Sequence, residues 1–466
     1  MIIDRTVTPS DLLPAVHALW RRSAETIGAL HETWNWKDGA PVYTARGRYT
    51  ARGWTDWTEG FHYGSALLQY DAIGEDRFLT IGRTGALRRM PAHVTHFGVH
   101  DHGFNNISTY GNLLRLIGEG RADPLDADVC RLALRCSGAV QAARWTPVRW
   151  DRTDGPPVPM GFVHSFNGPH SLFVDTIRSM RALAVAHALG QELLGEQDAR
   201  TSLLDRLCAH AAATAVWSVY YGEGRDAYDV PGRTAHECLF NPVNGSYRCP
   251  STQQGYSPFT TWTRGLAWAI CGFAELLEWF DARPQLKSSA GVAWAEPYLW
   301  RGATAAAEFY IAHTATDGVP YWDTGAPGLA QLGDWRARPA EPCNDHEPVD
   351  SSAAAIAAQG LLRLGSVAGQ RGEAEAASRW TRAGLTVART LFASPYLSDD
   401  PGHQGLILHA IYHRPNGWDY VPEGSSIPRG EACLWGDYHA RELALMILRM
   451  AEGTPWPRFF EIPDGS

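Results

Sequence analysis

Apolar residues recur at helical spacing in about a dozen segments of this 466-residue chain, and that repetition limits its fold more than any other feature. No change in composition marks a domain boundary. Eight evenly spaced strands rich in valine and isoleucine, as a TIM barrel requires, cannot be found. The segments expected to be helical are 11–30, 61–73, 76–89, 105–117, 127–143, 171–189, 198–221, 264–280, 299–315, 351–364, 373–392, 404–412 and 438–451.

The order of short and long connections indicates how these helices are arranged. A tight turn tends to be followed by a long loop rich in His, Asp, Trp and Gly, which leads into the next helix. Antiparallel helix pairs in a ring give this pattern, since every long loop then lies at the same end. We therefore predict an all-α fold, an (α/α)6 barrel, as one domain over residues 1–466 that includes helix 11–30; several separate domains are the alternative. The long loops are 145–169, 222–261, 317–349 and 416–436.

The composition narrows the classes of partner. The chain has 19 Trp, 17 Tyr and 18 His, a bias typical of carbohydrate-active proteins because flat rings stack on sugars. Its net charge is −9 and it has no run of Lys or Arg, which argues against a nucleic-acid partner. No stretch has the length and apolarity of a membrane span, and no export signal is found. Its 8 Cys form no C-x-x-C pair, so we expect free thiols and a cytoplasmic location.

The densest group of unusual side chains lies at the start of the apolar helical run near residue 264. Gln254 and Tyr256 are followed by Trp262, Arg264 and Trp268. Aromatic planes stack on pyranose rings and a guanidinium forks onto a carboxylate, so this group predicts a pocket for an acidic sugar. The alternative is that both tryptophans belong to the core and Arg264 is a surface charge.

Asp175 lies within an apolar run, where burial would raise the pKa of its carboxyl group and let it hold a proton near neutral pH. That is the requirement for a general acid. The alternative is a structural pair with Arg178 or Arg181.

Asp101 lies between His100 and His102 in a glycine-flanked loop that also follows His93 and His96. Four histidines invite a zinc hypothesis, but their spacing is irregular and no thiolate completes a known pattern. We expect a hydrogen-bonded polar loop beside the pocket, and no metal or cofactor. Asp350 and Asp437 stand where long loops enter helices, and there we expect helix capping.

Taken together, these motifs resemble those of the unsaturated glucuronyl hydrolases, glycoside hydrolase family 88, or a close sister family on the same barrel. The resemblance extends from about Trp54 to about Met450. Its motifs, in order, are Trp57-Thr58-Glu59-Gly60-Phe61, His100-Asp101-x-Gly103-Phe104, Val174-Asp175, Gln254-Gly255-Tyr256 with Trp262-x-Arg264-Gly265-x-x-Trp268, Val319-Pro320-Tyr321-Trp322-Asp323, Asp350-Ser351-Ser352-Ala353 and Trp435-Gly436-Asp437-Tyr438.

The resemblance implies the same barrel fold and an enzyme that removes an unsaturated uronic acid from the non-reducing end of lyase-generated oligosaccharides. It implies that Asp175 protonates C4 of the double bond and assists the water that adds at C5. Asp101 would be the second essential carboxylate. The substrate-binding residues it implies or suggests are His236, Gln254, Trp262, Arg264, Trp268, His100, Tyr256 and Trp57.

Other activities remain open at this point. A saturated uronide could be cleaved on the same barrel, with Asp101 and Asp175 both acting at the anomeric carbon. A polysaccharide lyase and a catalytically silent sugar-binding barrel are further alternatives. If the leading hypothesis of an unsaturated uronyl hydrolase holds, the expected partner is an acidic oligosaccharide. The sequence gives no indication of oligomeric state.

Overall fold

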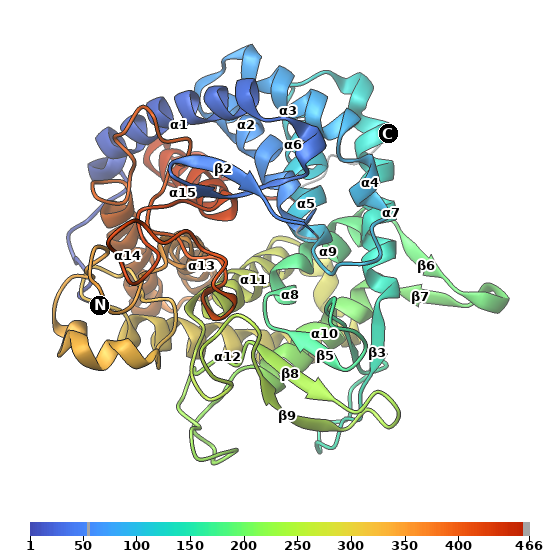
Figure 1. The fold of residues 1–466 in the computed structure, drawn as a ribbon. Coiled ribbons are helices and arrows are strands. Elements are labelled where there is room, and N and C mark those ends of the chain that lie inside the picture. Colours follow the sequence, from blue (N-terminus) through green and yellow to red (C-terminus); the bar gives the residue numbers. More distant parts are fainter. Residues whose placement is uncertain (54–55, 460–466) are drawn as a thin grey trace.

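A computed structural model describes residues 1–53 and 56–459 of the chain. Trp54, where the resemblance begins, and residues 460–466 of the predicted domain lie outside this range. Within it, helices arranged in a ring dominate the molecule (Figure 1). They are α1 (Leu13–Thr33), α2 (Glu59–Ile73), α3 (Asp76–Arg88), α4 (Pro91–Val94), α5 (His102–Asn106), α6 (Asn112–Gly118), α7 (Ala127–Ala143), α8 (Thr176–Ser179), α9 (Arg181–Ala188), α10 (Leu203–Trp217), α11 (Thr263–Ala282), α12 (Ala290–His313), α13 (Ser351–Gln370), α14 (Ala374–Leu391) and α15 (Leu434–Glu452).

The ring has an inner and an outer layer, and the sequence of each helix shows which layer it occupies. Every residue of α11 from Thr263 to Phe280 is buried, as expected for a helix with neighbours on all sides. In contrast, α14 buries one face and leaves the other exposed. Helix α11 packs between α12 and α13, and α15 packs against α2, which closes the ring. The predicted (α/α)6 barrel is therefore confirmed.

Short strands occur only on the connections between the described helices. They are β1 (Pro41–Ala45) with β2 (Arg48–Ala51), β3 (Trp145–Pro147) with β4 (Gly161–Val163), β5 (Ser171–Phe173) with β8 (Glu237–Phe240) and β9 (Tyr247–Ser251), and β6 (Glu192–Leu194) with β7 (Arg200–Ser202), all antiparallel. The sheet of β5, β8 and β9 lies beside α8 (Figure 1). It places segments from two long loops next to each other.

Three of the predicted helical segments are wrong in part or whole. In segment 198–221, residues 200–202 form strand β7 and the α-helix covers only residues 203–217. Residues 171–173 form strand β5, and the helical part of that segment begins at Thr176. The segment 404–412 is not helical, because its main-chain N–H groups bond to distant residues. Leu406 and Ile407 donate to Asp437 (both 2.9 Å), and Ala410 donates to the carbonyl of Glu431 (3.0 Å).

The main hydrophobic cluster draws residues from Val7 to Phe459. The single-domain assignment stays a prediction, and this continuous core supports it. No helix in the described ranges combines the length and apolarity that crossing a membrane would require.

Candidate active site

A cavity of about 300 Å³, named here the central cavity, holds most of the predicted site residues. Of the ten predicted residues, Tyr256 and His236 do not line it. The lining residues are Trp57, Val99, His100, Asp101, Phe104, Phe166, Asn167, Asp175, Gln253, Gln254, Trp262, Arg264, Trp268, Tyr412, His413, Asn416 and Trp418.

Asp101, His100 and Asp175 form a buried acid–histidine cluster in this cavity. The Nε2 atom of His100 lies 3.7 Å from Oδ1 of Asp101 and 3.8 Å from Oδ2 of Asp175. The side chains are almost fully buried, with 1%, 5% and 8% of His100, Asp101 and Asp175 exposed. Among the described residues, neither ring nitrogen of His100 nor Oδ1 of Asp175 has a hydrogen-bond partner. These atoms are therefore available to a ligand in the cavity.

The charges in this cluster decide where its proton resides. Burial raises the pKa of Asp101 to about 6. Burial also favours the neutral form of Asp175, but the attraction of the neighbouring His100 outweighs it and lowers the pKa of Asp175 overall. Conversely, the two carboxylates raise the pKa of His100 against the effect of its burial. The prediction that Asp175 has a raised pKa is therefore wrong for the free protein, because His100 holds the proton beside it.

The structural alternative for Asp175 is excluded. Arg178 forms buried ion pairs with Glu275 and Glu442, and Arg181 lies 3.9 Å from both of these carboxylates. Neither arginine pairs with Asp175, whose titratable neighbours include His100 and His236.

The sheet positions His236 next to Asp175. Phe173 of β5 pairs with Glu237 of β8, and the N–H of Val174 donates to the carbonyl of His236 (2.9 Å). Asp175 lies two residues after the end of β5 and His236 directly precedes β8, so this pairing places the two residues close together.

The imidazole of His236 is fixed as a hydrogen-bond donor. Its Nδ1 accepts the main-chain N–H groups of Gln253 (2.9 Å) and Gln254 (3.3 Å). Burial lowers the pKa of His236 to about 4, so the ring is neutral at pH 7 and its hydrogen is on Nε2. Within the described residues this buried Nε2 has no partner.

Arg264 does not present a free fork to the cavity, which corrects the predicted role. Its Nη1 donates to Oδ2 of Asp350 (2.9 Å) and to the carbonyl of Ile411. Its Nη2 donates to Oε1 of Gln254 (2.8 Å) and to the carbonyl of Tyr412 (2.7 Å). The guanidinium therefore orients Gln254 and anchors the loop at 411–412.

Aromatic side chains form the walls of the central cavity, as predicted for Trp57, Trp262 and Trp268. Trp268 packs against Phe104 with a ring separation of 4.8 Å, which fixes its plane. Tyr256 is the exception: its side chain is 51% exposed and lies outside the cavity lining, because its main-chain N–H is held by Asp323 (2.9 Å).

The polar motifs at other helix starts are structural. Asp350 caps α13 by accepting the N–H groups of Ser352 (3.1 Å) and Ala353 (3.4 Å), as predicted. Asp437 does not cap α15, contrary to prediction: its carboxylate accepts the hydroxyl of Tyr49 (2.8 Å) and two N–H groups of the 404–412 segment.

The histidine-rich loop does not converge on one point. His102 bonds to the hydroxyl of Ser137 (2.9 Å), and His93 pairs with Glu59 (2.8 Å). Single ligand atoms of His100, Asp101 and Asp175 do lie within 4.8 Å of one another, so these three residues could hold a cation. The expectation of no metal therefore stays a prediction.

Two loops contribute cavity residues that the sequence did not predict. Phe166 and Asn167 come from the connection between β4 and β5, and Tyr412, His413 and Trp418 from the segment before α15. The abundance of aromatic and polar residues in these long loops was the available signal, but nothing in the sequence indicates which of them face the cavity.

A ring of helix pairs with a buried acid–histidine cluster in an aromatic cavity at its loop end has the features of a carbohydrate-active (α/α)6 barrel. No protein-family model matches the chain. It is 27% identical over 422 residues to the unsaturated glucuronyl hydrolase of Bacillus sp. strain GL1, covering 88% of this chain and 91% of that one. It is 22% identical to a protein of the same name from Formosa agariphila, over 83% of this chain and 78% of that one.

Comparison with solved structures leads to enzymes of the same name. The crystal structure of the Bacillus sp. GL1 unsaturated glucuronyl hydrolase matches with a TM-score of 0.66 at 23% identity, over 96% of this chain and 100% of that one. The Streptococcus agalactiae enzyme of that name matches with a TM-score of 0.68 at 18% identity, over 98% and 99% of the two chains. The resemblance inferred from the motifs is thus confirmed over most of the chain.

Proposed function

We propose that this protein is a glycoside hydrolase that removes an unsaturated uronic acid from the non-reducing end of acidic oligosaccharides by hydrating its 4,5-double bond. One observation carries the proposal: Asp175, Asp101 and His100 share a buried cluster whose unpartnered atoms are available to a ligand in the central cavity. The names of the similar enzymes support the substrate class.

The first step needs a proton at C4 of the vinyl ether. In the free protein His100 holds that proton, 3.8 Å from Asp175. An anionic substrate that enters the cavity raises the pKa of the nearby Asp175 carboxyl group, because a second negative charge disfavours its ionised form. Asp175 delivers a proton to C4 and takes up the proton of the adjacent His100 as it does so.

The second step adds water at C5. Protonation at C4 leaves positive charge on C5 and the ring oxygen, and the Asp175 carboxylate accepts a proton from the attacking water. The water thus supplies the hydroxyl group of C5 and the proton that returns to Asp175, while C4 keeps the proton that it received in the first step. The resulting hemiketal opens and releases the remaining saccharide. The neutral His236 is suited to donate its Nε2 hydrogen to the substrate.

Cleavage of a saturated uronide at the anomeric carbon fits this geometry less well. Such enzymes use two carboxyl groups about 5–9.5 Å apart, on opposite sides of the bond that breaks. Here ligand atoms of Asp101 and Asp175 lie within 4.8 Å of each other and flank one histidine. This arrangement favours one acid–base carboxylate tuned by a second carboxylate.

A panel of substrates tests the proposal. Disaccharides generated by lyases from several acidic polysaccharides should lose their double-bond ultraviolet absorbance when the protein is added, while a saturated glucuronide chromogen should stay intact. Release of the chromogen without loss of absorbance would favour the saturated-uronide alternative. Rising absorbance on the intact polysaccharides would indicate a lyase.

The proposal includes a cytoplasmic location. All eight cysteines are free in the structure, five of them buried, as expected for a protein that keeps its thiols reduced.

A further inference from the structure

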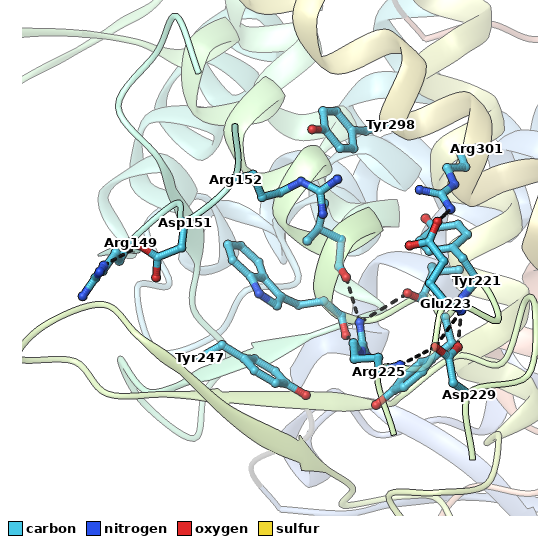
Figure 2. A pocket seen from close by; sticks show the side chains of 14 residues that line it. Arg149, Asp151, Arg152, Tyr221, Glu223, Arg225, Asp229, Tyr247, Tyr298 and Arg301 are labelled. Carbon is cyan, nitrogen blue, oxygen red and sulfur yellow. Dashed lines mark hydrogen bonds and ion pairs between the residues drawn. The ribbon is translucent and has the colours of Figure 1, made fainter. Parts of the chain in front are cut away.

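A second cavity of about 290 Å³, named here the outer pocket, lies between α10, α12, β9 and the loop after β3 (Figure 2). None of its described lining residues lines the central cavity. Its walls combine aromatic rings with guanidinium groups, among them Trp217, Tyr247, Tyr298, Arg152 and Arg225.

The floor of the outer pocket is held rigidly. Asp229 accepts the main-chain N–H groups of Gly222 (2.8 Å), Glu223 (3.0 Å) and Arg225 (2.8 Å), and a fourth from Tyr221 (3.2 Å). This carboxylate therefore organises the 221–229 loop and is not available to a ligand. The pocket is pre-formed, which reduces the entropy cost of binding.

The aromatic walls are also fixed. Trp217 and Tyr247 both pack edge-to-face against Phe240, with ring separations of 5.0 and 5.6 Å. Tyr298 and Trp217 each pack against Trp150, at 5.8 and 5.4 Å. Flat rings held in place are the surfaces on which pyranose rings stack.

The charge that faces this pocket is positive. Arg225 donates to the carbonyls of Val216 (2.8 Å) and Trp217 (2.6 Å), and among the described residues it has no carboxylate at ion-pair distance. Among the described residues, the one carboxylate at ion-pair distance from Arg152 is the exposed Asp154 (3.6 Å), and its guanidinium also lies over the rings of Trp150 (5.9 Å) and Tyr298 (5.8 Å). Two cations that carboxylates do not neutralise tightly favour an anionic ligand.

The acidic residues of the pocket are engaged elsewhere. Asp151 pairs with Arg149 (2.5 Å), Glu223 pairs with Arg301, and Asp229 holds the loop. None is a buried, unpaired carboxyl group of the kind that a general acid requires. The described lining of the outer pocket can therefore bind a ligand but offers no general acid to cleave it.

We propose that the outer pocket binds a uronate-containing oligosaccharide without cleaving it. The sugar rings stack on Trp217, Tyr247 and Tyr298, and Arg152 and Arg225 attract the uronate carboxylates. The site would hold acidic saccharide on the outside of the barrel, apart from the central cavity.

Calorimetric titration with saturated tetragalacturonate tests this proposal, and neutral cellotetraose is the matched ligand. The variant Arg152→Gln/Tyr247→Leu should bind tetragalacturonate at least ~10-fold more weakly than the wild type. Arg248→Gln is the matched control: Arg248 is exposed and follows Tyr247 on β9, so it points to the opposite face, and its variant should bind as the wild type does.

Turnover of a lyase-generated disaccharide and the melting temperature show whether the double variant is folded; both should match the wild type. Equal binding of tetragalacturonate by the double variant and the wild type would overturn the proposal, as would no binding by the wild type. Equally tight binding of cellotetraose would overturn the assignment to acidic saccharides. Because the experiment measures binding, it tests the outer pocket even if the proposed hydrolase activity is absent.

Discussion

The central cavity and the outer pocket have almost the same volume, about 300 and 290 Å³, and both combine aromatic rings with charged groups. They differ in how those charges are partnered. In the central cavity Asp101 and Asp175 are buried and share one histidine, whereas in the outer pocket Glu223 and Asp151 are exposed and each pairs with an arginine.

This difference in how the carboxyl groups are partnered distinguishes a site that can transfer protons from a site that can only bind a ligand. A carboxyl group changes its protonation near neutral pH only where burial and neighbouring charges compete, as in the central cavity. A carboxylate paired with arginine at the surface stays ionised and serves structure or recognition. Size and aromatic content alone would not have distinguished the two cavities.

The largest effect should come from Asp175→Asn, which removes the acid and base of both steps. We expect kcat for an unsaturated disaccharide to fall by about 10³-fold or more, with an unchanged melting temperature. The matched change in the outer pocket, Glu223→Gln, should leave turnover within about 2-fold of the wild type. An Asp175→Asn variant that retains wild-type turnover would remove the basis of the comparison.

Arg264→Met should act on stability more than on substrate affinity. Removing this guanidinium leaves the buried Asp350 without its ion-pair partner and frees the 411–412 loop, at a cost of roughly 3–5 kcal/mol in the free energy of unfolding. Arg152→Gln, at the exposed outer pocket, should cost less than about 0.5 kcal/mol. Urea denaturation measures both. A large rise in KM at unchanged stability would restore the predicted role of Arg264 as a fork for the substrate.

Asp101→Asn should change how stability depends on pH. The folded protein binds a proton at Asp101 with a pKa of about 6, above the 3.8 of an unperturbed aspartate, so the contribution of this group to stability is complete below pH 3.8 and is lost as the pH rises through 6. Asparagine carries no such loss. The variant should therefore be more stable than the wild type at pH 8, by up to about 3 kcal/mol, with the difference shrinking between pH 6 and pH 4.

Denaturant unfolding of the variant and of the wild type at pH 4, 6 and 8 checks this prediction. A difference between Asp101→Asn and the wild type that is the same at all three pH values would show that Asp101 is ionised throughout.

The smallest effect should come from Tyr256→Ala. The ring lies outside the lining of the central cavity, and its main-chain N–H, which the substitution keeps, makes the contact with Asp323. We expect kcat/KM to change by less than about 2-fold, whereas Trp268→Ala should lower it by ~10-fold or more, because a stacking wall is lost. Equal losses in steady-state assays of the two variants would place Tyr256 at the substrate after all.

Structural features that depend on neighbours close in the chain were predictable from the sequence. Helical periodicity gave the ring, and Asp350 followed by two serines gave a helix cap, because both rest on neighbours within a few residues. The errors concern partners far along the chain. Asp437 bonds to the 404–412 segment and removes its helix, and Asp350 and the carbonyls of Ile411 and Tyr412 occupy Arg264.

The wrong prediction of a raised pKa for Asp175 has the same origin, a partner far along the chain. Its apolar sequence neighbours indicated burial correctly, but the charge that decides the direction comes from His100, which lies 75 positions earlier in the chain. A motif can show that a carboxyl group is buried, while only the fold shows which charge lies beside it.

The reaction in D₂O, followed at early times, tests the central claim most directly. Hydration of the double bond through Asp175 places one deuterium at C4 of the released uronic acid as the ultraviolet absorbance disappears, and Asp175→Asn shows neither change. Release of the saccharide with the double bond intact and no deuterium at C4 would contradict the account.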